Sequence, residues 1–140
     1  MGILERGGLR AGTDFSVVVS PERVKSRLVF AKLSETPKIV GGLDNASAIA
    51  GADFYERWLG APVVNIGSLE AAELVKLAGM IYRDVNIALV NELANLAEVS
   101  GLDLWPILNA ANTDGETFLL RPGIGVGGPC TPVYPSFLIR

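Results

Sequence analysis

The sequence predicts an α/β protein: a short, mostly parallel three-stranded sheet with a βαβ unit, followed by a helical domain built on one long central helix. Two observations carry this prediction. Three short β-branched segments, with one helical segment between the second and third, occupy residues 1–67. From Leu69 to Ser100 the chain contains no proline. We therefore expect residues 1–67 to be the end of a dinucleotide-binding domain and residues 68–140 to be a helical central domain.

The first half of the chain carries the signals of three strands and one helix. Residues 15–19 are β-branched and aromatic, and residues 37–42 predict a second strand that ends in glycines. Asp44 is a good N-cap for a helix over residues 45–59. Residues 61–66 predict a third strand. A strand, a helix and a strand in this order are typical of a parallel βαβ unit with a right-handed crossover.

The long helix is predicted from its ends and from its apolar spacing. Ser68 is a good N-cap, and Gly101 closes the run. One apolar stripe recurs at intervals of three and four: Leu74, Leu77, Ile81, Val85, Leu89 and Leu93. Other apolar residues lie off that stripe: Val75, Ala78, Met80, Ile87 and Val90. A helix of about 48 Å exceeds what a small globule buries, so we expect it in a bundle or a dimer.

The last third of the chain predicts a short helix, a loop and the start of another element. Asp103 is an N-cap for a helix that ends near Ala111. Residues 121–132 hold four glycines and three prolines, which exclude a helix or a central strand. Residues 135–140 begin another element and are still apolar at the end, so we expect a chain that is cut short.

Composition excludes several classes of function. The 140 residues have a net charge of −3, which gives no strong attraction to nucleic acid or to an anionic membrane. The chain has no histidine, which excludes Ser-His-Asp and Cys-His catalysis and His-ligated metals. Its single cysteine, Cys130, excludes an internal disulfide and a cysteine metal cluster. Without a long apolar run or a secretory signal, a cytoplasmic protein is expected.

Two side chains are candidates for chemistry, and each has a plainer alternative. Cys130 follows the glycine-rich loop, where its thiolate would be a strong nucleophile, although a free cysteine is often a small core residue. Lys76 lies among apolar helix residues, where it would act as an acid or stabilise charge, although it could equally extend along a solvated edge. The residues alone favour the plainer alternative for both.

The glycine-rich segment does not match a dinucleotide-binding fingerprint. That fingerprint follows a strand and opens a helix. Here a helix precedes Gly123-x-Gly125-x-Gly127-Gly128, and Pro129 and Pro132 follow these glycines. A loop whose backbone amides contact a sugar or a phosphate fits the segment better. Ser20-Pro-Glu-Arg23 follows a strand end, where it is either part of a site or a turn with a surface ion pair.

Five motifs follow one another along the chain. They are Ser20-Pro-Glu-Arg-Val24, Pro37-Lys-Ile-Val-Gly-Gly42, Glu70-Ala-Ala-Glu-Leu-Val-Lys76, Tyr82-Arg-Asp-Val-Asn-Ile-Ala88 with Asn91-Glu-Leu-Ala94, and Pro122-Gly-Ile-Gly-Val-Gly-Gly-Pro-Cys130-Thr-Pro-Val133. In this order they resemble the UDP-glucose/GDP-mannose dehydrogenase family, and most of all its UDP-N-acetyl-D-mannosamine dehydrogenase branch. The resemblance covers the chain from about residue 9 to its end.

The resemblance implies a reaction and roles for particular residues. The family oxidises a sugar C6 alcohol to a carboxylate with two NAD and no metal. By resemblance, Cys130 attacks the C6 aldehyde to give a thiohemiacetal and then a thioester, which water hydrolyses. Lys76 would stabilise the oxyanion, and Glu22 would act in water activation. Arg23 and the loop backbone, at Gly125, Gly127 and Gly128, would bind the UDP-sugar.

Four positions depart from the family pattern. Met80 replaces an asparagine four residues after the lysine, and Tyr134 replaces an aspartate four residues after the cysteine. Losing an oxyanion donor costs about 10²–10³ in rate in other enzymes. Pro129 stands where this branch commonly has histidine, and Glu116 lies near the place of a family arginine. These positions leave the activity of the site open.

The chain also lacks the NAD-binding fingerprint with which family members begin, and the domain that completes the UDP site would follow residue 140. Three hypotheses remain. The chain is a segment of a UDP-sugar dehydrogenase, a dimerisation core with a decayed site, or a nucleotide-sugar binding protein. In the family the long helix forms much of the subunit interface. We therefore expect a homodimer or higher oligomer with little or no dehydrogenase activity.

Overall fold

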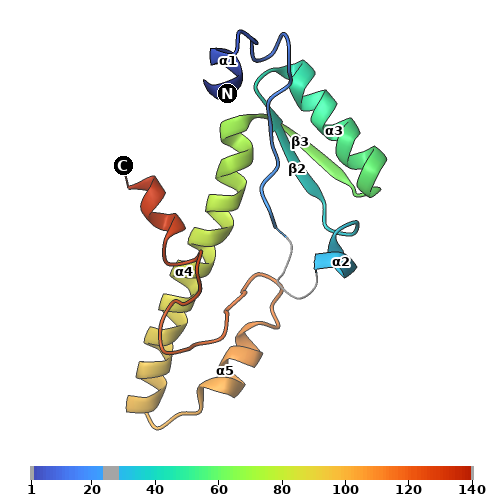
Figure 1. Cartoon of the computed structure of the whole chain (residues 1–140). Coiled ribbons are helices and arrows are strands. Elements are labelled where there is room, and N and C mark those ends of the chain that lie inside the picture. Colours follow the sequence, from blue (N-terminus) through green and yellow to red (C-terminus); the bar gives the residue numbers. More distant parts are fainter. Residues whose placement is uncertain (1, 24–28, 140) are drawn as a thin grey trace. The chain divides into compact units, whose positions relative to one another are not determined.

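A computed structural model of the chain describes residues 2–23 and 29–139 (Figure 1). Val24 and Arg140, which belong to two segments discussed above, lie outside the described residues. The elements are α1 (Gly2–Arg6), β1 (Val18–Val19), α2 (Val29–Lys32), β2 (Lys38–Gly42), α3 (Asn45–Leu59), β3 (Val63–Ser68), α4 (Leu69–Val99), α5 (Leu104–Ala111) and a 3₁₀ helix η1 (Tyr134–Leu138). The chain forms two compact units, residues 1–76 and 77–140, and each is described by itself. The predicted domain division at residue 67 stays a prediction.

The first unit holds a three-stranded sheet in the order β1-β2-β3. Strands β2 and β3 are parallel and are connected through α3, which confirms the βαβ unit. Strand β1 runs antiparallel to β2, so the sheet is mixed rather than mostly parallel. Of the expected strand over 15–19, only Val18 and Val19 pair with β2, because their partners Gly42 and Gly41 are the last residues of β2. Phe15 forms an isolated bridge with Ala11 instead.

Glycines at the end of β2 allow the layers of the first unit to approach closely. A Cβ atom on Gly41 would overlap the Ser68 carbonyl oxygen, and one on Gly42 would overlap the Ala48 amide nitrogen. On α3, a Cβ atom on Gly51 would lie 2.6 Å from a methyl carbon of Val18. These contacts explain why the second strand ends in two glycines: no other residue leaves room for the neighbouring backbone.

The expected helix over 45–59 is confirmed, together with both of its caps. The Ser47 amide donates to Asp44 Oδ1 at 2.7 Å, and Gly60 ends α3 with a φ of 60°. The hydrogen bonds from Ser47 to its carboxylate hold the pKa of Asp44 below its ordinary value of 3.8. The core of this unit is small: Ile39, Val40, Ser47, Ala48, Ala61 and Ala72 are buried.

Strand β3 passes directly into α4, as the sequence predicts. Asn65 Oδ1 accepts from the Gly67 amide at 2.9 Å where the register of β3 shifts against β2, and Gly67 has a φ of 89°. Ser68 Oγ then accepts from the Ala71 amide at 3.2 Å. Helix α4 runs for 31 residues, one short of the expected end.

In the second unit, the buried apolar residues of α4 come from outside the predicted stripe. Met80, Val90 and Ala97 are buried, as is Leu108 of α5. On the stripe itself, Val85 is 61% exposed and Leu89 is 50% exposed. The spacing therefore indicates the helix correctly, but it does not identify the face that this chain buries.

The rest of the second unit follows the expected order. Asp103 Oδ1 accepts from the Trp105 amide at 3.0 Å and caps α5, which ends at Ala111. Residues 112–133 form no regular element, and η1 follows them. Helices α1 and α2, which are shorter than two helical turns, were not predicted from the sequence. Among the described residues, no helix is long and apolar enough to cross a membrane.

Candidate functional site

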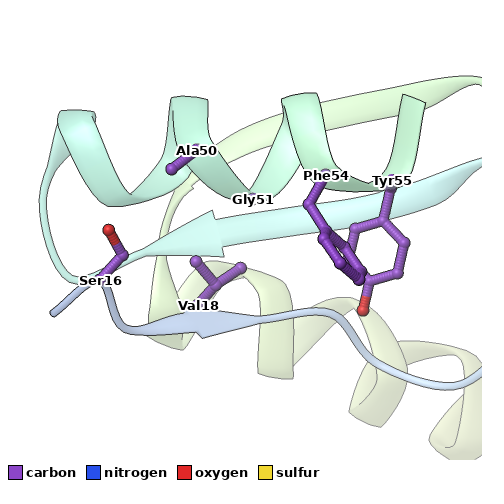
Figure 2. Close-up of a pocket in the computed structure, with 6 residues that line it drawn as sticks. All are labelled: Ser16, Val18, Ala50, Gly51, Phe54 and Tyr55. Carbon is purple, nitrogen blue, oxygen red and sulfur yellow. The ribbon is translucent and has the colours of Figure 1, made fainter. Parts of the chain in front are cut away.

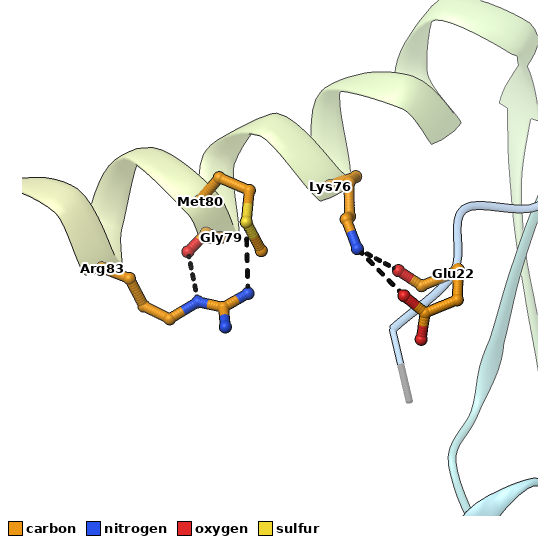
Figure 3. Close-up of polar contacts among 5 residues, drawn as sticks. All are labelled: Glu22, Lys76, Gly79, Met80 and Arg83. Carbon is orange, nitrogen blue, oxygen red and sulfur yellow. Dashed lines mark hydrogen bonds and ion pairs between the residues drawn. The ribbon is translucent and has the colours of Figure 1, made fainter. Parts of the chain in front are cut away.

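The first unit brings together Lys76 and Glu22, two of the three predicted catalytic residues (Figure 3). Lys76 Nζ donates to the Glu22 backbone carbonyl oxygen and lies 3.3 Å from Glu22 Oε2. The Lys76 side chain is 18% exposed, whereas that of Glu22 is 70% exposed. The Lys76 ammonium group is thus held against the segment after β1 by the backbone carbonyl oxygen of Glu22, which does not depend on the glutamate side chain.

Met80, four residues after Lys76 on α4, is buried and contacts a cation (Figure 3). Arg83 Nη2 lies 3.4 Å from Met80 Sδ, and Arg83 Nε donates to the Gly79 carbonyl oxygen at 3.3 Å. A thioether is a weak acceptor and donates nothing. Met80 therefore supplies no hydrogen bond to an oxyanion at the position where the resemblance expects an asparagine.

The second unit contains the glycine-rich loop and Cys130. A Cβ atom on Gly125, Gly127 or Gly128 would meet no described atom within 4 Å, and only Gly128 of these has a positive φ, 100°. The packing of this chain thus does not require glycine at Gly125 or Gly127, and their backbone amides stay accessible. Such an open, side-chain-poor loop can admit a ligand close to its backbone.

Cys130 is half-buried and begins a turn that leads into η1. Its carbonyl oxygen accepts from the amides of Val133 and Tyr134, each at 3.0 Å. The Tyr134 ring packs edge-to-face on that of Phe137, with the ring centroids 5.8 Å apart. An aromatic pair thus occupies the position where the resemblance expects an aspartate.

Three asparagines to which the sequence assigned no role fix the segment that leads into the loop. Asn86 of α4 donates to the Phe118 carbonyl oxygen at 2.8 Å and accepts from the Leu120 amide at 2.8 Å. Asn91 Oδ1 accepts from the Gly123 amide at 2.9 Å. Asn112 accepts from the Leu119 amide at 2.7 Å and donates to its carbonyl oxygen at 3.0 Å. Asn86 and Asn91 belong to one of the five motifs, which does not indicate their partners.

Glu116 and Arg23 are both exposed. Glu116 lies in a turn built by Asp114, whose Oδ1 accepts from the amides of Glu116 and Thr117 at 2.9 and 2.7 Å. The hydrogen bonds from Thr117, through its hydroxyl and its amide, hold the pKa of Asp114 below the ordinary value of 3.8. The backbone amide of Glu116 thus stabilises this turn by its hydrogen bond to Asp114. The predicted substrate-binding role of Arg23 stays a prediction.

The described residues do not fit NAD, the cofactor that the resemblance implies. The glycine-rich loop leads into η1 rather than joining a strand to an α-helix. Gly41 and Gly42, at the end of β2 before α3, leave no room because backbone already fills the space beside them, and Gly67, at the end of β3 before α4, is a single glycine rather than a glycine-rich turn. The Asp44 carboxylate also occupies the N-terminus of α3, where a pyrophosphate would bind.

A shallow hollow lies in the first unit, apart from the predicted site residues. Figure 2 shows its lining: Ser16, Val18, Ala50, Gly51, Phe54 and Tyr55. It is mostly apolar, and the Phe54 and Tyr55 rings meet edge-to-face with centroids 5.4 Å apart. The hollow has no charged side chain, and none of the candidate catalytic residues lines it.

Comparison with known proteins gives a consistent answer. The model of the UDP-glucose/GDP-mannose dehydrogenase family, central domain, matches residues 70–140. The UDP-N-acetyl-D-mannosamine dehydrogenase of Methanocaldococcus jannaschii is 38% identical over 120 residues, which cover 86% of this chain and 28% of that relative. The NDP-N-acetyl-D-galactosaminuronic acid dehydrogenase of Ralstonia nicotianae is 34% identical over 127 residues, 91% of this chain and 30% of that relative.

Solved structures agree in fold. The UDP-D-ManNAc dehydrogenase of Pyrococcus horikoshii matches with a TM-score of 0.87 and 37% identity, over 96% of this chain and 32% of that one. The NDP-N-acetyl-D-galactosaminuronic acid dehydrogenase of Methanosarcina mazei matches with a TM-score of 0.84 and 35% identity, over 99% of this chain and 30% of that one. The chain thus spans less than a third of the length of these relatives.

Proposed function

The chain belongs to the UDP-glucose/GDP-mannose dehydrogenase family, and we propose that it is the central segment of a UDP-sugar 6-dehydrogenase that acts on UDP-N-acetyl-D-mannosamine. One observation carries the proposal. The chain is 38% identical to UDP-N-acetyl-D-mannosamine dehydrogenases, and it keeps Cys130 behind an open glycine-rich loop. The contact between Lys76 and Glu22 supports it, since both are residues to which the resemblance gives catalytic roles.

In the proposed chemistry, Cys130 is the nucleophile. Its thiolate sulfur forms a bond to C6 of the aldehyde, and the carbonyl π electrons become an oxyanion. The Lys76 ammonium group stabilises that oxyanion, and it is suited to do so because it is little exposed and already held by the Glu22 carbonyl oxygen. Glu22 keeps an exposed carboxylate that can take a proton from the water that hydrolyses the later thioester.

NAD is the hydride acceptor in the whole enzyme under this proposal. The residues described here do not fit it, so no hydride step is assigned to them. We expect the chain by itself to form no NADH from UDP-N-acetyl-D-mannosamine. Formation of NADH that is lost in the Cys130→Ala variant would contradict this expectation.

The UDP-sugar is proposed to bind along the backbone of Gly125, Gly127 and Gly128, with Arg23 as a further contact. The open space beside these glycines supports this role. We further propose a cytoplasmic homodimer or higher oligomer that assembles through α4. Its exposed apolar residues support that assembly: Tyr82, Val85, Leu89, Leu96 and Val99.

A dimerisation core without catalysis is the second candidate. Met80 and the Tyr134–Phe137 pair favour it, because they replace polar side chains that would orient water and stabilise the oxyanion. The exposed apolar residues of α4 fit both candidates and do not discriminate between them.

Calorimetric titration of the chain with UDP-N-acetyl-D-mannosamine separates the candidates. The proposal predicts saturable binding of the UDP-sugar, weaker binding of free UDP, and no binding of NAD. Sedimentation of the same sample measures the oligomeric state. A dimer that binds no UDP-sugar at millimolar concentration would contradict the dehydrogenase segment and support the dimerisation core.

A further inference from the structure

One hydrogen bond ties the start of the glycine-rich loop to α4: the Gly123 amide donates to Asn91 Oδ1 at 2.9 Å. At the end of the loop, the Cys130 carbonyl oxygen accepts from the amides of Val133 and Tyr134, which forms a local turn into η1. Among the described residues, no hydrogen bond involves positions 124–129 between these points. The Ile124 side chain is fully exposed, so packing does not hold the loop there either. The segment that leads into the loop is therefore the place where hydrogen bonds from α4 can set the position of Cys130.

The start of the loop is fixed by amide side chains of α4 in place of a neighbouring strand. Asn86 accepts from the Leu120 amide and donates to the Phe118 carbonyl oxygen, as a paired strand would do. It also donates to the Tyr82 hydroxyl at 3.1 Å, which itself donates to the Phe118 carbonyl oxygen at 2.8 Å. Asn91 continues the same series at Gly123. The segment 118–123 thus returns to α4 after α5 (Figure 1).

The segment runs along α4 in the same direction as the helix, since Phe118 and Leu120 bind Asn86 and Gly123 binds Asn91. Asn86 and Asn91 are five residues apart, a rise of about 7.5 Å. Their donors, Leu120 and Gly123, are three residues apart, which spans about 10 Å of extended chain. A segment held at these two points has one register against the helix. A shift by one residue would leave the donors and acceptors of Asn86 unmatched.

We propose that Asn86 and Asn91 are positioning residues for Cys130: their side-chain amides set the register of residues 118–123 on α4 and thereby the place of the loop that carries the thiol. The inference rests on the proposed function only for the role of Cys130 as nucleophile. The two residues differ in a testable way. Asn91 is used only as an acceptor toward Gly123, whereas Asn86 is used as both donor and acceptor.

The test uses the full chain, in which Cys130 is the single cysteine. Its rate of alkylation by iodoacetamide, followed by mass spectrometry without denaturant, reports how well the loop holds the half-buried thiol. In Asn91→Leu we expect a rise of about fivefold, the factor that corresponds to one lost hydrogen bond. Asn91→Asp keeps an acceptor for Gly123 and is expected to stay at the wild-type rate.

For Asn86→Asp we expect the opposite result from Asn91→Asp, although aspartate has nearly the same shape as asparagine. It keeps the acceptor for Leu120 but loses the donor, and it places a carboxylate against the Phe118 carbonyl oxygen. We expect its alkylation rate to rise at least as much as that of Asn91→Leu. Asn95→Leu is the matched control, since Asn95 is exposed on α4 and its side chain makes no hydrogen bond to a described residue. It is expected to react at the wild-type rate.

A purely structural role predicts another pattern. If the variants acted through lower stability alone, the alkylation rate of Cys130 would rise in proportion to the loss in thermal midpoint, whichever asparagine atom is replaced. Positioning predicts that Asn91→Leu raises amide exchange at Gly123, measured by NMR, while exchange within α3 stays unchanged. Equal rates in Asn91→Leu and Asn95→Leu, or equal rates in Asn86→Asp and Asn91→Asp, would overturn the inference.

The two proposals fail separately. If the wild-type chain binds no UDP-N-acetyl-D-mannosamine but the alkylation pattern holds, the positioning of Cys130 stands and the proposed function falls. If the chain binds the UDP-sugar but all asparagine variants react at the wild-type rate, only the positioning inference is overturned.

Discussion

The two units of this chain use glycine for opposite purposes. In the first unit, Gly41 and Gly42 are places where backbone from a neighbouring element fills the space that a side chain would need. In the second unit, the space beside Gly125 and Gly127 is open, and the chain is held by asparagine side chains rather than by close packing. Glycine next to backbone indicates a structural constraint, whereas glycines next to open space in a side-chain-poor loop leave room for a ligand.

The largest expected effect is on the packing of the first unit. Gly41→Ala should lower the free energy of unfolding by about 3 kcal/mol, because the new Cβ atom would overlap the Ser68 carbonyl oxygen and force the backbone apart. Urea unfolding followed by circular dichroism measures this loss. Trp58, in a Trp105→Phe background, adds a fluorescence signal from the first unit alone.

Gly79→Ala is the control for that substitution. Gly79 lies inside α4, and a Cβ atom there would meet no described atom within 4 Å. Alanine is the better helix former, so we expect a gain of about 0.5–1 kcal/mol. If Gly41→Ala were as well tolerated as Gly79→Ala, the close approach at the end of β2 would be wrong.

A smaller effect is expected from the polar anchors of the second unit. Asn112→Ala removes both hydrogen bonds to Leu119 and should cost about 1–2 kcal/mol. Trp105 fluorescence in a Trp58→Phe background measures the unfolding of this unit. Asn109→Ala, an exposed change within α5, should cost no stability, because alanine is the better helix former. An equal loss in both variants would contradict the role of the hydrogen bonds to Leu119.

Both units should lose stability in acid, through one carboxylate each. Hydrogen bonds hold the pKa of Asp44 and of Asp114 below 3.8 in the folded chain. The stability that each carboxylate contributes is present above pH 3.8 and is lost as the pH falls through the lower folded value. Asp44→Asn keeps an N-cap that does not titrate, so unfolding of the first unit should become less dependent on pH between about 4 and 2. Asp114→Asn should do the same for the second unit only.

Local signals predicted the elements well. Asp44, Ser68 and Asp103 each cap the helix that the sequence assigned to them. The antiparallel pairing of β1 was not predictable, because strand direction depends on which neighbour pairs with it rather than on its own residues. The buried face of α4 was also missed. Apolar residues surround that helix, so period alone does not decide between Val90, which is buried, and Val85, which is exposed.

The roles of the site residues stay a prediction. The resemblance pointed to Lys76 and Glu22, and the structure brings them into contact. Spacing gave no sign that Asn86, Asn91 and Asn112 bind the backbone of residues 118–123, because their partners lie 7 to 34 residues away in sequence. The pairing of Cys130 with Lys76 in one site stays a prediction.

Under the proposed function, the space beside the loop glycines is for a UDP-sugar and not for the chain itself. A titration of Gly125→Ala with UDP-N-acetyl-D-mannosamine, together with the thermal midpoint of the variant, tests this claim. We predict a midpoint within about 2 °C of wild type, because the Cβ atom meets open space, and a loss of at least about tenfold in affinity, because it enters the ligand's space. Unchanged affinity, or a lost fold, would contradict the claim.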